Sequence, residues 1–371
     1  MPGQLYTDRE MVFFLSKIPC IGSAAVRKLK ETILPLSDVL KLDRLFLLAA
    51  GLSELQSDAL KKCSGMMESV PAEMENAEKS GIRFLMAGEP GWLERLNHIP
   101  YPPAYIFFKG DLPPDDVPSV SIVGSRNATN YGIRMAEYAA GELARKGICI
   151  VSGMAAGIDS AAHRGALSAD GKSFAVLGNG VNICYPKENY DIFEKMGEGG
   201  CGGIISEFPP GTPALPSHFP MRNRIIAALS DILIVAEARG VKSGSQITVN
   251  FALEQGKEVF AVPGRITDPL SRGCNDLIKS GASILTSPDD VLESFGILRE
   301  GRLTIEKKSP AGLNAEQKKV FDILDAEPMF LEDIILKTEM DTGKVMSILL
   351  TLELDGLIVQ TSGNYYSASL K

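Results

Sequence analysis

The sequence predicts an α/β protein built around a doubly wound sheet, with a small helical domain before it and a winged-helix-like domain after it. Between Ser119 and about residue 294, short apolar runs alternate with helical stretches, as they do in βαβ units. Most of these runs are apolar throughout, as expected of parallel strands that are buried on both faces. Different patterns flank this region, and 371 residues suggest two or three domains.

Residues 1–80 are predicted to form short helices. The segment from Ile18 to Lys30, IPCIGSAAVRKLK, places apolar residues at helical spacing after a Gly22-Ser23 turn. Ser23 is expected to cap the helix. The segment also has the outline of a helix-hairpin-helix turn, whose backbone amides can contact a phosphate, although the second glycine common in such hairpins is missing. A purely structural helical module and a DNA-contacting hairpin both remain open.

Residues 81–118 are predicted to be a proline-rich connection that carries one short strand, Ala104–Lys109. Proline is poorly tolerated inside helices and central strands, so we expect this connection at the surface or at a sheet edge. Residues 119–296 are predicted to be the doubly wound domain. Its expected strands are Val120–Val123, Ile148–Val151, Ser173–Leu177, Gly203–Ser206, Ile232–Ala236, Glu258–Val262 and Ser283–Leu285.

Residues 297–312 are predicted to be a linker, and residues 313–371 a small third domain. Asn314 and Gln317 form a capping-box pattern before a helix, and two further helical patterns follow. The run from Leu357 to Tyr366 predicts a hairpin around Ser362-Gly363-Asn364. Three helices and a hairpin are typical of a winged helix. Acidic residues outnumber basic ones here, which favours a protein-contact or packing role over DNA binding without excluding the latter.

The bulk composition is that of an ordinary soluble globular protein, with 45% hydrophobic and 23% charged residues. The formal net charge is −8, so any nucleic-acid site has to be a local basic patch. Six cysteines without a C-x-x-C pair, and three histidines, predict reduced thiols and no metal site. The N-terminus resembles no secretory signal, and the longest apolar run is too short to span a bilayer. We therefore expect a cytoplasmic protein without membrane contact.

Small residues follow several of the predicted strands, at the edge of the sheet where α/β proteins bind their ligands. Gly124-Ser125-Arg126 follows the first strand, Ser152-Gly153 the second, and Ser243-Gly244-Ser245 opens a later helix. Such residues allow a ligand to approach the backbone closely, and the helices behind them offer free amides. Any one of these glycines could equally mark a tight turn. Together with nearby Arg and Lys residues, they predict a site for a polyanion.

The segment from Ser217 to Ser245 contributes most of the predicted site. It carries Arg222, Asn223 and Arg224 before an expected helix at Ile225–Leu229, and Lys242 after the next strand. We expect these residues to meet at one sheet edge, where Arg and Lys supply charge for phosphates. Phe219 is either a packing residue or a stacking platform for a base.

Asp159 and His163 are four residues apart on a predicted helix. They are either a helix cap beside a packed histidine or a general acid–base pair. Signatures of nucleotide enzymes are missing. Gly171-Lys172-Ser173 has Ala166 where a P-loop requires glycine, and Gly178-Asn179-Gly180 does not continue into a dinucleotide fingerprint. No cofactor and no catalytic residue are predicted.

These motifs resemble the DNA-processing protein A family (DprA, also called Smf) over about Pro100 to Glu293. The resemblance is carried by IVGSR from Ile122, SGMAAGIDSAAH from Ser152, LGNGVNICYPKEN from Leu177, IISEFPPG from Ile204, HFPMRNRII from His218, VAEA from Val235, KSGS from Lys242, ALEQGKEVFAVPG from Ala252 and GCNDLIKSGA from Gly273. It implies an extended Rossmann domain that binds single-stranded DNA, loads the RecA recombinase onto it in natural transformation, and forms a homodimer. It also implies a sterile-alpha-motif-like N-terminal domain and a C-terminal winged helix.

By position, the resemblance implies that Arg126 and Lys187 contact phosphates. It implies that Arg222, Asn223, Arg224 and Lys242 form further walls of the pocket. No RecA-contact residue can be assigned in this way. The complete predicted DNA site comprises Gly124, Ser125, Arg126, Ser152, Gly153, Lys187, Phe219, Arg222, Asn223, Arg224, Lys242, Ser243, Gly244 and Ser245.

Two other functions compete with DNA binding. Nucleoside-monophosphate phosphoribohydrolases of the lysine-decarboxylase-like superfamily carry a P-G-G-x-G-T-x-x-E loop whose glutamate acts at the glycosidic bond. The comparable turn, Val241–Thr248, has Thr248 in the place of that glutamate, which counts against hydrolysis. A scaffold whose acidic outer domains recruit partners is the third possibility, and the basic residues of the predicted pocket argue against it.

Overall fold

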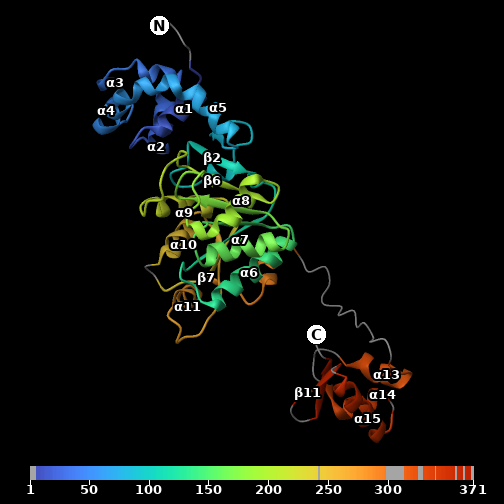
Figure 1. The fold of residues 1–371 in the computed structure, drawn as a ribbon. Helices are drawn as coiled ribbons and strands as arrows, with labels where there is room; N and C mark the ends of the chain where they lie inside the picture. The colour runs from blue at the N-terminus through green and yellow to red at the C-terminus, as the bar shows by residue number, and fades with distance from the viewer. Residues whose placement is uncertain are drawn as a thin grey trace. The chain divides into compact units, whose positions relative to one another are not determined.

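The computed structural model describes residues 6–240, 243–297, 313–324, 329–338, 340–355, 357–361 and 364–368. The chain divides into two compact units, Met1–Leu298 and Arg299–Lys371 (Figure 1). The predicted fold class is confirmed: the first unit holds a helical module and a large α/β sheet, and the second has the helices and hairpin of a winged helix. None of the described helices is both long and apolar enough to cross a membrane.

In the described part of the first unit, nine strands form one sheet in the order β1-β2-β6-β5-β4-β3-β7-β8-β9. The strands from β6 to β9 run parallel, whereas β2 is antiparallel to both β1 and β6. The bounds are β1 Arg83–Met86, β2 Tyr105–Gly110, β3 Ser119–Gly124, β4 Cys149–Ser152, β5 Ser173–Leu177, β6 Gly202–Ser206, β7 Ile232–Glu237, β8 Glu258–Ala261 and β9 Ser283–Ile284. Every predicted strand of the central domain is present, and β2 matches the strand predicted in the connection. Only β1 was not predicted.

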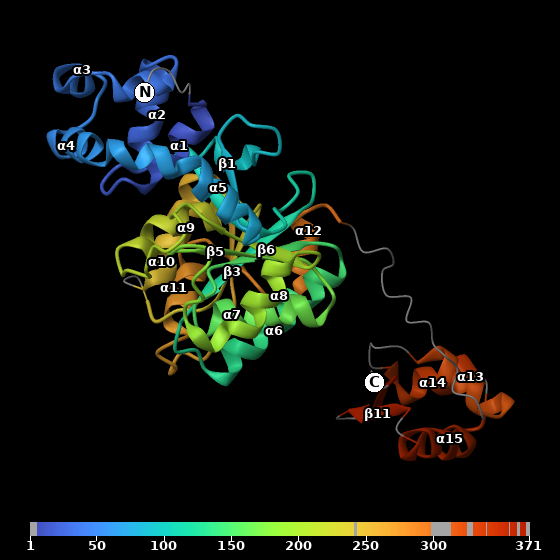
Figure 2. The same ribbon diagram turned by 45° about the horizontal axis from the view of Figure 1, so that its top comes forward.

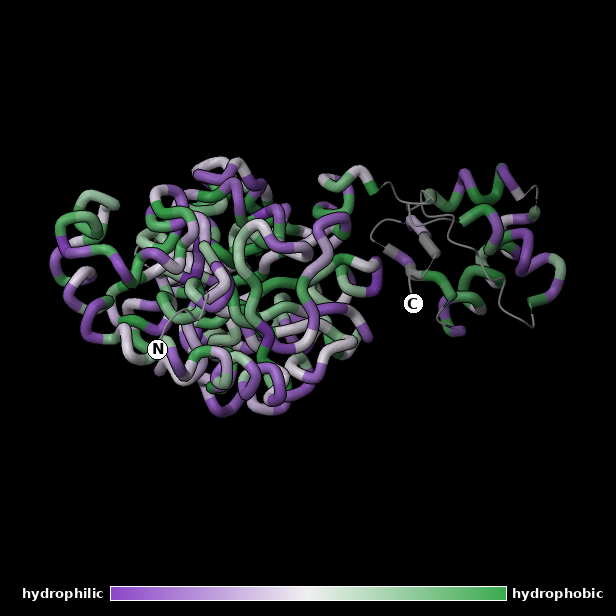
Figure 3. The backbone as a smooth tube through the Cα atoms, turned by 90° about the horizontal axis from the view of Figure 1, so that it is seen from above, coloured by the Kyte–Doolittle hydropathy of each residue, from purple (hydrophilic) through white to green (hydrophobic). Residues whose placement is uncertain are grey.

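Helices cover both faces of the sheet (Figure 2). One face packs against α6 (Asn130–Arg145), α7 (Ile158–Ser168), α8 (Tyr190–Glu198) and α12 (Pro288–Ser294). The other packs against α9 (His218–Ala228), α10 (Gly244–Glu254) and α11 (Arg272–Lys279). Both faces of the central strands are therefore buried, which explains why these strands are apolar throughout. Hydrophobic stretches run through the middle of this unit, and hydrophilic ones recur around its outline (Figure 3).

The order of the strands creates a switch point between β3 and β7. From β3 the chain adds β4, β5 and β6 on one side, and then returns to add β7, β8 and β9 on the other. The connections on the two sides of this point lie on opposite faces of the sheet, so the carboxyl ends of β3 and β7 flank an opening. This opening is the expected position of a ligand site.

The helical module packs directly on the sheet. Its elements are α1 (Asp8–Lys17), α2 (Ser23–Thr32), η1 (Leu36–Leu40), α3 (Arg44–Ala49), α4 (Glu54–Cys63), η2 (Ser64–Ser69) and α5 (Val70–Lys79). Residues of α1 and α2, such as Phe13 and Val26, share one hydrophobic cluster with Phe107 of β2 and Ile204 of β6. The predicted cap of α2 was wrong, because Gly22 is the N-cap and no side chain caps this helix.

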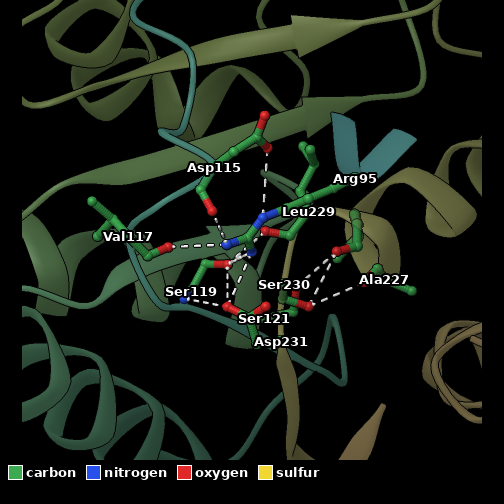
Figure 4. Close-up of polar contacts among 10 residues, drawn as sticks. Arg95, Asp115, Val117, Ser119, Ser121, Ala227, Leu229, Ser230 and Asp231 are labelled. Carbon is green, nitrogen blue, oxygen red and sulfur yellow. Dashed lines mark hydrogen bonds and ion pairs between the residues drawn. The ribbon is translucent and has the colours of Figure 1, made fainter. Parts of the chain in front are cut away.

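Arg95 ties the connection to the start of the sheet (Figure 4). It follows Glu94 in the short helix η3 (Glu94–Leu96), and its guanidinium donates to Asp231 at 3.0 Å and to the carbonyls of Asp115 and Val117 at 2.9 and 3.1 Å. The same Asp231 carboxylate accepts from the Ser119 amide at 2.9 Å. This network joins the amino end of β3 to the segment between α9 and β7.

The second unit contains α13 (Ala315–Ile323), α14 (Leu331–Thr338) and α15 (Thr342–Leu354), with strands β10 (Met329–Phe330), β11 (Ile358–Thr361) and β12 (Tyr365–Ala368). The capping box predicted at Asn314 and Gln317 is present. Strands β11 and β12 pair antiparallel, as the predicted hairpin requires. Ser362 and Gly363 of its turn lie outside the described residues. Strand β10, which pairs with β12, was not predicted.

Candidate nucleic-acid interface

A hollow of about 620 Å³ opens at the switch point between β3 and β7. It is formed by the ends of these strands, the amino-terminal part of α9 and the start of α10. We call it the strand-end hollow. Nine of the predicted site residues line it: Gly124, Ser125, Arg126, Phe219, Arg222, Asn223, Ser243, Gly244 and Ser245.

Glycine at the end of β3 allows the backbone to pack closely at the rim of the hollow. A Cβ atom at Gly124 would lie 2.6 Å from the Ile158 side chain and 2.7 Å from the Glu237 carbonyl. The next residue, Ser125, donates its amide to that same carbonyl at 2.8 Å. Glycine here therefore fixes the direction in which the chain leaves β3 and presents Arg126.

The amino terminus of α10 faces the strand-end hollow. Ser243 is the N-cap, but its side chain makes no capping hydrogen bond and instead meets the Ser245 hydroxyl at 2.9 Å. The first amides of a helix lack partners within the helix, and the helix dipole adds partial positive charge there. An eleven-residue helix opening into the hollow through Gly244 and Ser245 is thus a suitable place for a phosphate.

Arg126 and Phe219 form a stacked pair in the hollow. The Arg126 guanidinium carbon lies 4.7 Å from the centre of the Phe219 ring, within the range of a cation–π contact. Arg126 is exposed, and in the described part of the chain it has no ion-pair partner. The ring of Tyr185 lies 5.9 Å from Phe219. Phe219 is half-buried, so both the packing and the stacking roles predicted for it remain possible.

Arg222 is buried beneath this pair. Its Nη1 donates to the Gly153 carbonyl at 2.7 Å and to the carbonyl of Val176, and its Nε donates to the Asn223 side chain at 3.1 Å. Burial lowers the pKa of Arg222 to about 10, while the nearby Asp159 carboxylate acts to raise it and Arg126 to lower it. Arg222 therefore ties the ends of β4 and β5 to α9 while it places positive charge at the floor of the hollow.

Four other predicted residues are described but do not line the strand-end hollow. Ser152 is buried and donates its hydroxyl to the Ile122 carbonyl at 2.6 Å. Gly153 lies beneath the hollow, where a Cβ would come within 2.5 Å of Asp159 and 2.6 Å of Arg222. Lys187 is exposed at the start of η4 (Lys187–Asn189), two residues after Tyr185. Arg224 lines a different cavity.

The prediction that both Arg222 and Arg224 line this pocket was wrong for Arg224, because α9 starts at His218 rather than Ile225. Residues two apart on a helix point in nearly opposite directions. Arg222 accordingly faces the strand-end hollow, and Arg224 forms a buried ion pair with Glu207 at 2.6 Å. Lys242, also predicted for the pocket, lies outside the described residues.

Asp159 and His163 have separate partners in the described structure. Asp159 lines the hollow and accepts from the Ala155 amide at 3.3 Å, and burial raises the pKa of its carboxyl group. The Nδ1 atom of His163 lies 2.7 Å from the Ser173 hydroxyl, and burial lowers the pKa of this histidine to about 3. A buried, neutral histidine bonded to a serine fits the packing alternative better than the acid–base alternative.

Residues beyond the predicted set also line the hollow, notably Asn127, Tyr185 and Arg239. Arg239 is exposed, and it follows β7 as Arg126 follows β3. A search for cations directly after both strands at the switch point would have found it. Tyr185 lies within the motif that suggested Lys187, but only its ring contact with Phe219 identifies it.

The glutamate expected of the phosphoribohydrolase alternative has no counterpart in the comparable turn. Thr248, which stands in its place, is buried at the wall of the hollow. Glu237 at the end of β7 is also buried, and its carboxylate accepts from the Thr129 amide at 2.8 Å and from the Thr129 hydroxyl. Glu237 thus holds the start of α6. Asp159 is the one carboxylate among the described residues that line the hollow.

Comparison with known proteins identifies the family. Residues 83–296 match the family model of DNA recombination-mediator protein A, and residues 305–364 match the DprA winged helix domain. The chain belongs to the DNA recombination-mediator protein A family. The first match begins at β1, so this family domain includes β2, which the sequence analysis had placed in the connection, and β1, which it had not predicted.

Members of this family are similar to the chain over most of its length. A protein Smf from Synechocystis sp. is 33% identical over 328 residues, which are 79% of this chain and 82% of the relative. The X-ray structure of DNA processing protein A from Streptococcus pneumoniae has a TM-score of 0.66 and 32% identity, covering 78% of this chain and 98% of that one. A DNA processing protein A from Helicobacter pylori, described for its single-stranded DNA binding mode, has a TM-score of 0.52 and 28% identity, covering 58% and 96%.

Proposed function

We propose that this protein binds single-stranded DNA in the strand-end hollow. The observation that carries the proposal is the stacked pair of Arg126 and Phe219 beside the amino terminus of α10. Phosphates are bound by charged side chains and free amides, and unpaired bases by aromatic rings. The Helicobacter pylori relative, described for its single-stranded DNA binding mode, supports the same ligand.

The proposed role is that of a recombination mediator, which loads the RecA recombinase onto incoming single strands in natural transformation. Membership of the family supports this role. We further propose that the protein acts in the cytoplasm as a homodimer formed through the Rossmann domain. A dimer would present two hollows to one strand, which raises the apparent affinity without any new contact.

The hollow favours holding a strand over cleaving it. Its one carboxylate among the described residues, Asp159, is buried beside Arg222, and Thr248 stands where the phosphoribohydrolases carry their glutamate. Incubation of the purified protein with AMP tests the enzymatic alternative. The proposal expects no release of adenine, and robust turnover would favour the hydrolase instead.

The first prediction concerns Arg126, an exposed cation that lines the hollow. Replacing Arg126 with Ala removes one phosphate contact, so we expect single-stranded DNA affinity to fall about tenfold, equivalent to about 1.4 kcal/mol. The slope of log K against log salt should become shallower by about 0.7. A mobility-shift series with single strands, duplex and RNA over a range of salt measures both quantities.

Arg145→Ala is the matched control for this experiment. Arg145 is an exposed arginine on α6 that pairs with Glu142 and does not line the hollow. Its removal lowers the net charge by the same amount but should leave both affinity and salt slope unchanged. Equal affinity of wild type and Arg126→Ala, or an equal loss in both variants, would contradict the assignment of the hollow.

A further inference from the structure

A second cavity of about 880 Å³ lies between the helical module and the α/β part of the first unit. We call it the module cavity. It shares no lining residue with the strand-end hollow within the described chain. Helix α9 separates the two, because Phe219 and Arg222 face the hollow while His218 and Arg224 face the module cavity.

The hairpin between α1 and α2 presents unused amides to the module cavity. Cys20 adopts the left-handed conformation that such hairpins usually reserve for glycine (φ 66°), and its carbonyl accepts from the Gln56 side chain at 2.9 Å. In the described part of the chain, the Ser23 and Ala24 amides at the start of α2 have no acceptor. A Cβ atom at Gly22 would meet nothing within 4 Å, so this helix end is open to a ligand.

Arg224, which lines the same cavity, carries a buried polar atom without a partner among the described residues. The residue is 6% exposed, and its Nη2 atom donates to both Glu207 oxygens, at 2.8 and 2.6 Å. Its Nη1 atom is buried and has no hydrogen-bond partner among the described residues. A buried guanidinium nitrogen without an acceptor costs free energy, and Arg224 belongs to the lining of the module cavity.

A flat aromatic surface forms another wall of the module cavity. The rings of Phe208 and His218 stack with centroids 4.1 Å apart and an interplanar angle of 17°. The Nδ1 atom of His218 lies 3.1 Å from the Gly178 carbonyl, which can only accept, so Nδ1 carries the proton and the ring is held in place. Exposed Tyr101 and Met221 line the same cavity.

We propose that the module cavity is a second binding site and that it takes a single nucleotide. The phosphate lies at the α2 amides, the base packs on the Phe208–His218 surface, and Arg224 faces an acceptor of the same nucleotide. The hairpin lines the cavity, whose volume of about 880 Å³ is in the range of small-molecule sites. The nucleotide is either free or part of a strand. If it is part of a strand, that strand leaves the strand-end hollow and crosses α9, so this alternative rests on the proposed function.

Protection of the Cys20 thiol tests the proposal, because Cys20 is exposed and lines the module cavity. The rate of its alkylation by N-ethylmaleimide is measured by peptide mass spectrometry, with dTMP or with oligothymidylates of increasing length. Half-buried Cys63, which does not line the cavity, is the internal control. We expect saturating probe to slow alkylation of Cys20 severalfold and to leave Cys63 unaffected. Protection by dTMP identifies a free nucleotide as sufficient, and protection only by longer oligomers identifies the strand.

A charge substitution at exposed Ala24 tests where the phosphate lies. Ala24→Asp places a carboxylate in the first turn of α2, where it favours the helix but repels a phosphate. We expect half-protection of Cys20 to require about tenfold more probe in this variant. The neutral control Ala24→Asn should behave like the wild type, and the thermal midpoint of each variant checks its fold.

Two results would overturn the inference. One is an unchanged rate of Cys20 alkylation when DNA binding, measured by mobility shift, is saturated and still depends on Arg126. That result would leave the proposed function intact. The other is equal protection in Ala24→Asp and Ala24→Asn. If the wild-type protein gives no mobility shift, both the proposed function and a DNA strand as the source of the nucleotide are contradicted. Protection of Cys20 by dTMP would still support the site in the module cavity.

Discussion

At the scale of single residues, three arginines close together in the sequence or structure have different roles. Arg126 is exposed and free to meet a phosphate, Arg222 is buried and bonded to strand-end carbonyls, and Arg224 is paired with Glu207. The type of residue alone predicted charge at all three positions. The helix start at His218 decides that Arg222 and Arg224 point to different sides of α9.

The second prediction separates stacking from charge at Phe219. Phe219→Leu keeps an apolar side chain but removes the ring, so we expect a loss of about 1–3 kcal/mol in binding free energy to single-stranded DNA. The salt slope should stay as in the wild type, because no phosphate contact is lost. Mobility shifts over a salt series measure both quantities. Tyr138→Leu, which removes an exposed ring from α6, is the control, and a wild-type affinity for Phe219→Leu would leave Phe219 a packing residue only.

At the scale of helices and strands, the sequence predicted the elements that are marked by a pattern in their own residues. Long apolar runs predicted the strands of the central domain correctly. Strand β1 has four residues, Arg83–Met86, and exists because it pairs with β2, which no local pattern reveals. The helix was predicted to begin at Ile225, whereas α9 begins at His218 and carries Pro220 in its first turn. Proline is tolerated in the first turn of a helix, where its missing amide would have no partner.

The third prediction concerns the polar network that holds the amino end of β3. Arg95→Ala removes hydrogen bonds to Asp231 and to two carbonyls, so we expect the free energy of unfolding to fall by about 2 kcal/mol. Single-stranded DNA affinity should not change, because the strand-end hollow lies at the opposite end of β3. Chemical denaturation measures the free energy of unfolding, and mobility shifts measure the DNA affinity. Arg145→Ala, which removes an exposed ion pair, should leave the free energy of unfolding almost unchanged. An equal loss of stability in both variants would show that the Arg95 network has no special role.

At the scale of the whole molecule, the protein is acidic but concentrates positive groups at one switch point. Its formal net charge is −8, yet Arg126, Arg222 and Arg239 meet at the strand-end hollow. The sequence allowed this local patch to be predicted, because Arg126 directly follows a strand. It did not predict that the helical module shares a core with the sheet, since such packing depends on contacts between distant segments. The module cavity could not be predicted for the same reason.

The fourth prediction concerns the pH dependence of stability. Burial lowers the pKa of His163 from 6.5 to about 3, so in this range the unfolded chain binds a proton that the folded protein does not. The contribution of neutral His163 to the free energy of unfolding is therefore complete above pH 6.5. It is lost as the pH falls towards 3, by about 1.4 kcal/mol per pH unit. His163→Asn, which cannot titrate here, should flatten this part of the stability curve. Parallel curves for wild type and variant, measured by denaturation at several pH values, would show that His163 does not cause the dependence.

The proposed function depends on an unpaired strand lying in the strand-end hollow. A crystal structure of the full chain with an oligothymidylate tests it most directly. We expect a phosphate at the amino terminus of α10 near Arg126 and a base against Phe219. A strand bound at another surface, with the strand-end hollow empty, would contradict it.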